Sequence, residues 1–111
     1  MLADEYSLRY YVAGNRARPF GKWLQSLSDL SAAAQVQVRL DRLRFGNLGN
    51  ARSLRKGLWE LCIDMGPGYR VYFTQEGKTV LLLCGGDKGS QSRDIRRARE
   101  YLADYRRRSD A

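Results

Sequence analysis

Hydrophobic residues in the first half of the chain recur at the three- and four-residue spacing of amphipathic helices. Pro19 suits the first turn of a helix, and the stripe after it consists of Phe20, Trp23, Leu24, Leu27 and Leu30. Ser31 can cap a second helix that ends near Gly46, and its stripe consists of Ala33, Val36, Leu40 and Leu43. The pattern predicts an antiparallel helical hairpin whose stripes belong to the core.

The second half of the chain follows a period of two residues. Apolar and polar residues alternate over 59–64 and 69–75, as in strands with one buried face. Residues 79–84 are apolar without alternation, which is typical of a central strand covered on both faces. Residues 6–12 alternate loosely and predict a first strand.

A third helical stripe follows Lys88, and it consists of Ile95, Ala98, Leu102 and Tyr105. Ser90 or Ser92 can cap this helix. Its other side is rich in arginine and is either a solvated face or a phosphate-binding surface. The expected order is an N-terminal strand, a helical hairpin, a three-stranded antiparallel meander and a C-terminal helix. It indicates one α+β domain over residues 1–111, with the helices packed on the apolar face of the sheet.

The turn between the two alternating strands sets their register. A three-residue loop over 66–68 is the shortest that keeps the apolar residues of both strands on one face, and it places Asp64 opposite Arg70. The other face then carries Glu60, Cys62, Asp64, Arg70, Tyr72 and Thr74. Residues 51–57 are expected to form a basic loop that leads into the sheet.

The charge balance narrows the choice of partners. Twenty Lys and Arg against twelve Asp and Glu give a net charge of +8, which favours a polyanion such as nucleic acid or an acidic protein. Histidine is absent, and the strand phases point Cys62 and Cys84 to opposite faces, so we expect no disulfide, metal or cofactor. Residues 1–5 are polar and no apolar run spans a membrane, which predicts a cytoplasmic protein without a signal peptide.

Four motifs in order carry a resemblance to a known family. They are F-x-x-W-L-x-x-L at 20–27, R-L-x-R-L-x-x-G-N at 39–47, G-P-G-Y-R-V-Y-F at 66–73 and L-L-C-G-G-D-K-x-x-Q-x-x-D-I at 82–95. Together they make the chain resemble the HigB-like addiction module killer proteins of the RelE/ParE toxin superfamily. The resemblance covers about residues 5 to 105.

The resemblance implies the toxin of a type II toxin–antitoxin pair, held inactive by a HigA-like helix-turn-helix antitoxin. RelE-like and HigB-like members cleave messenger RNA on the ribosome without a metal, so a metal-independent endoribonuclease is expected. Operator DNA would be bound only through the antitoxin complex. Two alternatives remain: a ParE-like toxin that poisons gyrase, and an inactive relic that binds its antitoxin as a co-repressor.

The resemblance also assigns roles to residues. Arg70 matches the arginine beneath the scissile phosphate, and Lys88 falls at the basic position after the last strand. Glu60 matches an acidic position of relatives, whereas Cys62 stands where a basic residue is common. Chemically, the guanidinium of Arg70 could stabilise the negative charge of a phosphorane dianion. Lys88 can act as a general acid or base, and Glu60 can act as a general base if it is desolvated.

Each of these residues also has a purely structural interpretation: an ion pair with Asp64 for Arg70, a surface lysine for Lys88, and pairing with Arg55 or Lys56 for Glu60. Four residues are candidates for substrate binding, namely Arg55, Lys56, Gln91 and Arg93. Gln91 and Arg93 would contact RNA backbone or simply cap and solubilise the last helix.

Overall fold

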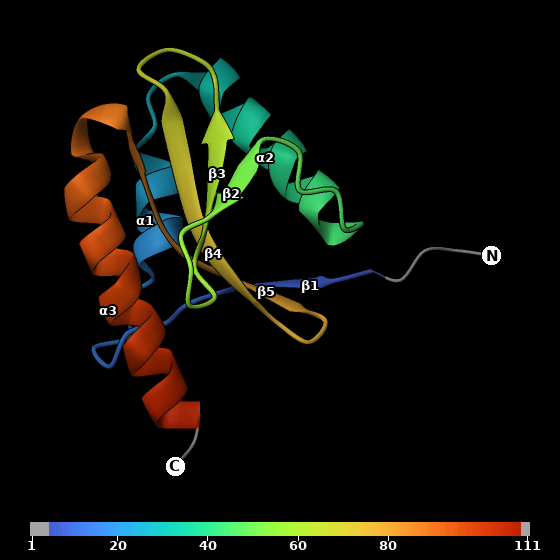
Figure 1. Cartoon of the computed structure of the whole chain (residues 1–111). Coiled ribbons are helices and arrows are strands. Elements are labelled where there is room, and N and C mark those ends of the chain that lie inside the picture. Colours follow the sequence, from blue (N-terminus) through green and yellow to red (C-terminus); the bar gives the residue numbers. More distant parts are fainter. Residues whose placement is uncertain (1–4, 110–111) are drawn as a thin grey trace.

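Helices and strands follow the predicted order, with one strand added. The computed structural model describes residues 5–109, so the two ends of the predicted domain, 1–4 and 110–111, lie outside the described residues. The elements are β1 (Ser7–Tyr10), α1 (Pro19–Ser26), α2 (Leu30–Arg44), β2 (Ala51–Ser53), β3 (Trp59–Ile63), β4 (Tyr69–Glu76), β5 (Thr79–Asp87), the short 3-10 helix η1 (Lys88–Ser90) and α3 (Gln91–Ser109) (Figure 1). The α+β class is confirmed.

The boundary between α1 and α2 lies earlier than the hydrophobic stripe suggests. Leu27 is extended and ends α1, and Leu30 begins α2 with 81% of its surface exposed. The cap of α2 is Asp29, whose carboxylate accepts hydrogen bonds from the amides of Ser31 and Ala32. The prediction of Ser31 as the cap was wrong, because an aspartate two residues earlier already satisfies these orphan donors.

The five strands within residues 5–109 form one mixed sheet in the order β1-β5-β4-β3-β2. β1 runs parallel to β5, and the other neighbours are antiparallel. β5 is therefore an inner strand, and its residues 80–84 are buried, as its continuous apolar run predicts.

The predicted register between β3 and β4 was wrong by two residues. Cys62, rather than Asp64, lies opposite Arg70. The connecting loop spans 64–68 instead of 66–68, because Gly66 and Gly68 adopt positive φ values of 50° and 82° and bend the chain within a longer turn. A shift of two residues preserves the faces, so the polar residues of both strands still share one side of the sheet.

Residues 51–53 form a strand, β2, where a loop was expected. Arg52 pairs with Glu60 across an antiparallel ladder between β2 and β3. The basic residues before β3 therefore belong to two structures: Arg52 to the sheet, and Arg55 and Lys56 to the turn that follows it.

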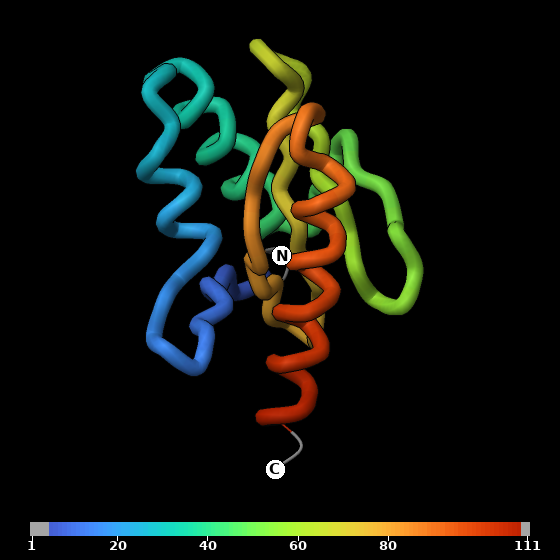
Figure 2. Tube along the Cα trace, turned by 90° about the vertical axis from the view of Figure 1, so that its left-hand side faces the viewer, coloured from blue at the N-terminus to red at the C-terminus, as the bar shows by residue number. Residues whose placement is uncertain are grey.

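Helices cover both faces of the sheet. One core contains Phe20, Val36 and Phe73, from α1, α2 and β4, and the other contains Tyr72, Leu83 and Leu102, from β4, β5 and α3. Figure 2 shows α1 and α2 on one side of the strands, away from α3. The prediction that all helices pack on one face was wrong for α3, because the face judged polar also bears apolar residues of β5. No helix within residues 5–109 is long and apolar enough to cross a membrane.

A register shift in the β4–β5 ladder explains where the cysteines point. Tyr72 pairs with Cys84 but Phe73 pairs with Leu82, so Leu83 is an extra residue in β5. Cys84 therefore faces the same side as Tyr72, and so does Cys62. The predicted opposite orientation of the two thiols was wrong, and both cysteines are free.

We expect Gly85→Ala to lower the free energy of unfolding by about 1 to 3 kcal/mol, the usual cost of overpacking a filled core. A Cβ at this position would collide with the indole ring of Trp23, which lies against the strand. Urea unfolding measures the effect. Gly14→Ala is the matched control, since no atom lies within 4 Å of its added Cβ, and equal stability of the two variants would contradict this packing.

Candidate functional site

A buried carboxylate lies at the centre of the α3 side of the sheet. Glu60 on β3 has no exposed surface. It accepts hydrogen bonds from Arg52 Nε at 2.7 Å, from the Tyr72 hydroxyl at 2.8 Å and from Gln91 Nε2 at 2.8 Å. The three donors come from β2, β4 and the start of α3, so a single side chain links four elements.

The environment of Glu60 keeps it ionised. Burial raises the pKa of its carboxyl, but hydrogen bonds from Gln91, Tyr72 and Arg52 outweigh burial and hold the pKa below its ordinary value. Burial, reinforced by the hydrogen bond to Glu60, raises the pKa of the Tyr72 phenol. A general base needs a free lone pair and a raised pKa. The geometry therefore favours Glu60 as an anchor and not as the base that the sequence suggested.

Arg70 lies beside this anchor with part of its hydrogen-bonding capacity unused. Its Nε is 4.0 Å from Glu60 Oε2, and this buried nitrogen has no hydrogen-bond partner. Nη1 donates to the Tyr69 carbonyl at 3.2 Å. The side chain is 15% exposed, so a part of it can be reached by an anion from solvent. The alternative ion pair with Asp64 does not form; Glu60 is the neighbouring carboxylate.

Gly68 brings Arg70 and Lys88 together. Its carbonyl accepts a hydrogen bond from the Lys88 amide at 2.9 Å. A Cβ built on Gly68 would lie 3.4 Å from Arg70 Nη1 and 3.6 Å from Lys88 Cβ. With a φ of 82°, this position favours glycine both for its backbone and for the space it leaves. Two of the three predicted catalytic residues therefore flank one loop.

The turn that presents Lys88 is rigidly capped. The Asp87 carboxylate accepts hydrogen bonds from the amides of Gly89 at 2.8 Å and Ser90 at 3.2 Å, and the Ser90 hydroxyl interacts with the Asp87 backbone in return. The side chain of Lys88 is exposed at this turn. Ser90, predicted as a cap of the last helix, is thus the last residue of η1, and Asp87 is the residue that caps η1.

Gln91 and Arg93 have different surroundings. Gln91 uses its amide nitrogen on Glu60, which makes it part of the buried cluster and not a free RNA contact. Arg93 is 59% exposed, and its Nε lies 3.9 Å from Asp94 Oδ1. Of the two predicted backbone-binding residues, Arg93 alone is placed to meet a ligand from solvent.

Arg55 and Lys56 lie away from the other candidates. They are exposed in the turn between β2 and β3, with φ values of 74° and 54°. The Lys56 carbonyl accepts a hydrogen bond from Arg106, about four turns or ~22 Å beyond Gln91 along α3. The structure therefore separates the predicted residues into a group around Arg70 and a second group at this turn.

Arginines in the second half of α3 hold loops in place. Arg99 donates to the Leu54 carbonyl, Arg106 to the Lys56 carbonyl and Arg108 to the Val12 carbonyl. Part of the cationic face of the helix is thus engaged in structural hydrogen bonds, a role that the sequence pattern did not distinguish from phosphate binding.

Cys62 lies opposite Arg70 and next to Glu60. Its Sγ is 3.9 Å from Glu60 Oε1. Burial raises the pKa of this thiol, so it stays protonated at neutral pH. Cys62 therefore places a small neutral group opposite Arg70.

Glu60 and the side chains around it, Arg52, Arg70, Tyr72 and Gln91, form what we call the Glu60 cluster. Two of its members were not identified as functional from the sequence. Tyr72 was placed on the correct face but given no role, and Arg52 was assigned to a loop. If residues 51–63 had been interpreted as a β-hairpin, Arg52 would have been predicted as a partner of Glu60, because the two residues lie directly opposite each other in the ladder. Within residues 5–109, no group of three or more His, Cys, Asp or Glu side chains is placed to hold a metal ion.

Comparison with known proteins identifies a relative. No family model and no solved structure matches the chain. A Haemophilus influenzae protein, described as uncharacterized, is 49% identical to it over 81 residues, which cover 72% of this chain and 82% of the relative. The chain belongs to the family of this Haemophilus protein.

We expect Glu60→Gln to lower the free energy of unfolding at pH 7 by about 2 to 3 kcal/mol, because charged hydrogen bonds are lost in a buried site. The folded-state pKa of Glu60 is below the unfolded value near 4.5. Its stabilisation is therefore present above pH 4.5 and is lost as pH falls through the folded pKa. Urea unfolding from pH 7 to pH 3 measures both effects.

Glu5→Gln is the control for this experiment, since it removes an exposed ion pair with Arg44. Glu60→Gln should flatten the acid branch of the stability curve, and Glu5→Gln should leave it unchanged. An acid branch that is the same in wild type and Glu60→Gln would exclude the anchor role.

Proposed function

We propose that the chain is the toxin of a type II toxin–antitoxin pair, a HigB-like member of the RelE/ParE superfamily that cleaves messenger RNA on the ribosome. The observation that carries the proposal is the position of Arg70 and Lys88 on either side of Gly68, with the partly exposed Arg70 side chain beside Glu60. The four family-like motifs and the element order support the same assignment.

The chemistry proposed is attack of the RNA 2′-oxygen on the adjacent phosphorus. The 2′-hydroxyl loses its proton to water, a P–O bond forms to the 2′-oxygen, the P–O bond to the 5′-oxygen breaks, and a cyclic phosphate and a 5′-hydroxyl result. Arg70 stabilises the dianionic phosphorane through its guanidinium fork. Lys88, exposed on its capped turn, supplies the proton to the leaving 5′-oxygen.

Glu60 takes no proton in this scheme. Its three hydrogen bonds and its neighbouring cation hold the carboxylate in place, and the carboxylate in turn orients Arg70 and Arg52. Since the best-placed carboxylate is occupied, the cluster supplies cations but no evident base for the 2′-hydroxyl. We therefore infer that efficient cleavage requires the ribosome, which orients the message for attack.

We expect Arg70→Ala to lower cleavage by about 100-fold or more, in line with the loss of one transition-state donor. Arg70→Lys should not restore it, because an ammonium lacks the planar fork. The measurement maps new transcript 5′ ends in cells briefly induced for each variant. Arg42→Ala, an exposed helical arginine outside the cluster, is the control.

Other outcomes of this experiment would overturn the nuclease assignment. Growth arrest with intact transcripts would indicate gyrase as the target. Continued growth in the absence of the antitoxin would indicate a relic that only binds, which the neutral Cys62 beside Arg70 would then explain.

We expect the double change Arg55→Gly, Lys56→Gly to weaken binding to ribosomes without altering the rate of cleavage once bound. Both residues have positive φ, which glycine adopts without strain, so the turn should keep its shape. Their distance from Lys88 leaves them to contact RNA backbone outside the reaction. Single-turnover cleavage on programmed ribosomes, at varied protein concentration, separates the two effects; a slower rate at saturation would contradict this division.

A further inference from the structure

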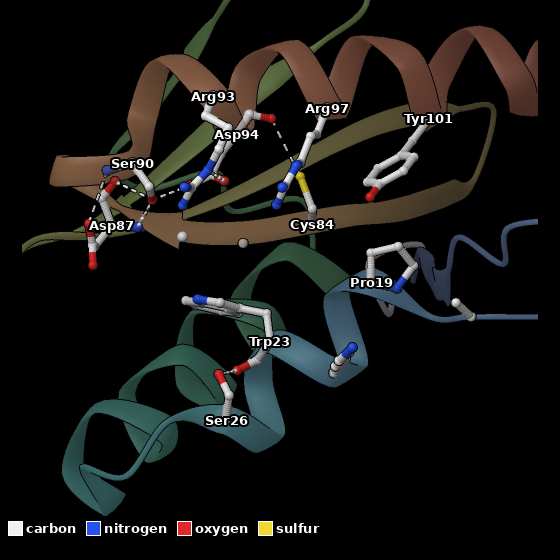
Figure 3. Close-up of a pocket in the computed structure, with 14 residues that line it drawn as sticks. Pro19, Trp23, Ser26, Cys84, Asp87, Ser90, Arg93, Asp94, Arg97 and Tyr101 are labelled. Atoms are coloured by element: carbon white, nitrogen blue, oxygen red, sulfur yellow. Dashed lines mark hydrogen bonds and ion pairs between the residues drawn. The ribbon is translucent and has the colours of Figure 1, made fainter.

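An open cleft of about 540 Å³ lies between α1 and α3 (Figure 3). Its floor is formed by residues 84–87 of β5. Because α1 and α3 pack on opposite faces of the sheet, a cleft lined by both helices lies at the edge of the sheet. It is distinct from the Glu60 cluster, which lies on the face.

β5 has an open edge along this floor. β1 pairs with it from Thr79 to Leu82, and the Tyr11 amide makes one further hydrogen bond to the Leu82 carbonyl. Beyond Leu82, β5 pairs with β4 on one side and, within the described chain, with no strand on the other. A strand edge of this kind presents backbone donors and acceptors that another extended chain can pair with.

The walls of the cleft combine aromatic and cationic side chains. Trp23 from α1 lies against Gly85, and its indole ring fills the space that a side chain at this position would occupy. Arg93, Arg97 and Tyr101 come from successive turns of α3 at four-residue spacing and point toward the cleft in Figure 3.

The available charge in the cleft is positive. Lys22 and Arg97 line it and make no ion pair with any carboxylate among residues 5–109. Asp94 is 4% exposed and is engaged by the Ser90 hydroxyl and by Arg93. Asp87, the other acidic lining residue, caps the η1 helix.

We propose that this cleft binds an extended acidic segment of a protein partner, which adds to the sheet as a strand beside β5. Main-chain hydrogen bonds to residues 84–87 supply affinity, and acidic side chains on the segment pair with Arg97 and Lys22. A segment of about four residues spans ~13 Å along the floor. The open strand edge favours a peptide over a nucleotide, because a peptide alone matches the spacing of its donors and acceptors.

The experiment selects a phage-displayed library of random decapeptides on the purified full-length chain. We expect enriched peptides to carry acidic residues at alternate positions and to slow amide hydrogen exchange at residues 83–87. Arg97→Glu should weaken their binding about tenfold or more, while Arg96→Glu, the same charge change on a neighbouring residue outside the cleft, should weaken it less than about threefold.

Several results would overturn the proposal: no enrichment, peptides without acidic residues, or protection confined to the edges at β1 or β2. Stronger protection of residues 83–87 by a hexauridylate than by the selected peptides would reassign the cleft to nucleic acid. The test is independent of the proposed cleavage, since it measures binding at the sheet edge and uses no activity.

Discussion

The burial of one ionised carboxylate constrains the architecture around the sheet. A charge removed from water is tolerated only when donors surround it, and the donors that surround Glu60 come from β2, β4 and α3. The short β2 strand is paired where Arg52 meets Glu60, and α3 begins where Gln91 reaches it. Arg70 occupies the remaining side of the carboxylate. The cluster thus couples fold stability to the position of the cation proposed for phosphate binding.

Alternation along a strand is a local property, and it correctly predicted which residues share each face of β3 and β4. Register is not local: the turn that sets it uses five residues with two glycines at positive φ, and its length was not evident from composition. The same limit applies to the extra residue Leu83, which reverses the orientation of Cys84. β2 was missed because three residues, two of them exposed, carry no periodic signal without their partner strand.

Like the fold, the candidate site could be predicted from the sequence only in part. Arg70 and Lys88 could be placed near each other, because a hairpin and the end of the following strand bring them to one end of the sheet. The contact between Gln91 and Glu60 could not, since it depends on α3 crossing the face that was judged to be open. The sequence also could not tell which arginines of α3 are structural and which are free for a ligand. Arg99, Arg106 and Arg108 donate to carbonyls of loops distant in sequence, and the positions of these loops follow from the tertiary structure.

The parallel pairing of β1 with β5 has a consequence for the order of folding. Ser7 pairs with Thr79, so β1 can join the sheet only after β5 has been synthesised. Contacts this distant in sequence close slowly, and until they form, the apolar sides of α1 and α2 lack part of their cover. β4, which carries Arg70, also gains its second neighbouring strand only when β5 pairs with it, with Arg70 opposite Gly86. A nascent chain of this topology therefore completes the sheet around Arg70 only after β5 has been synthesised and paired.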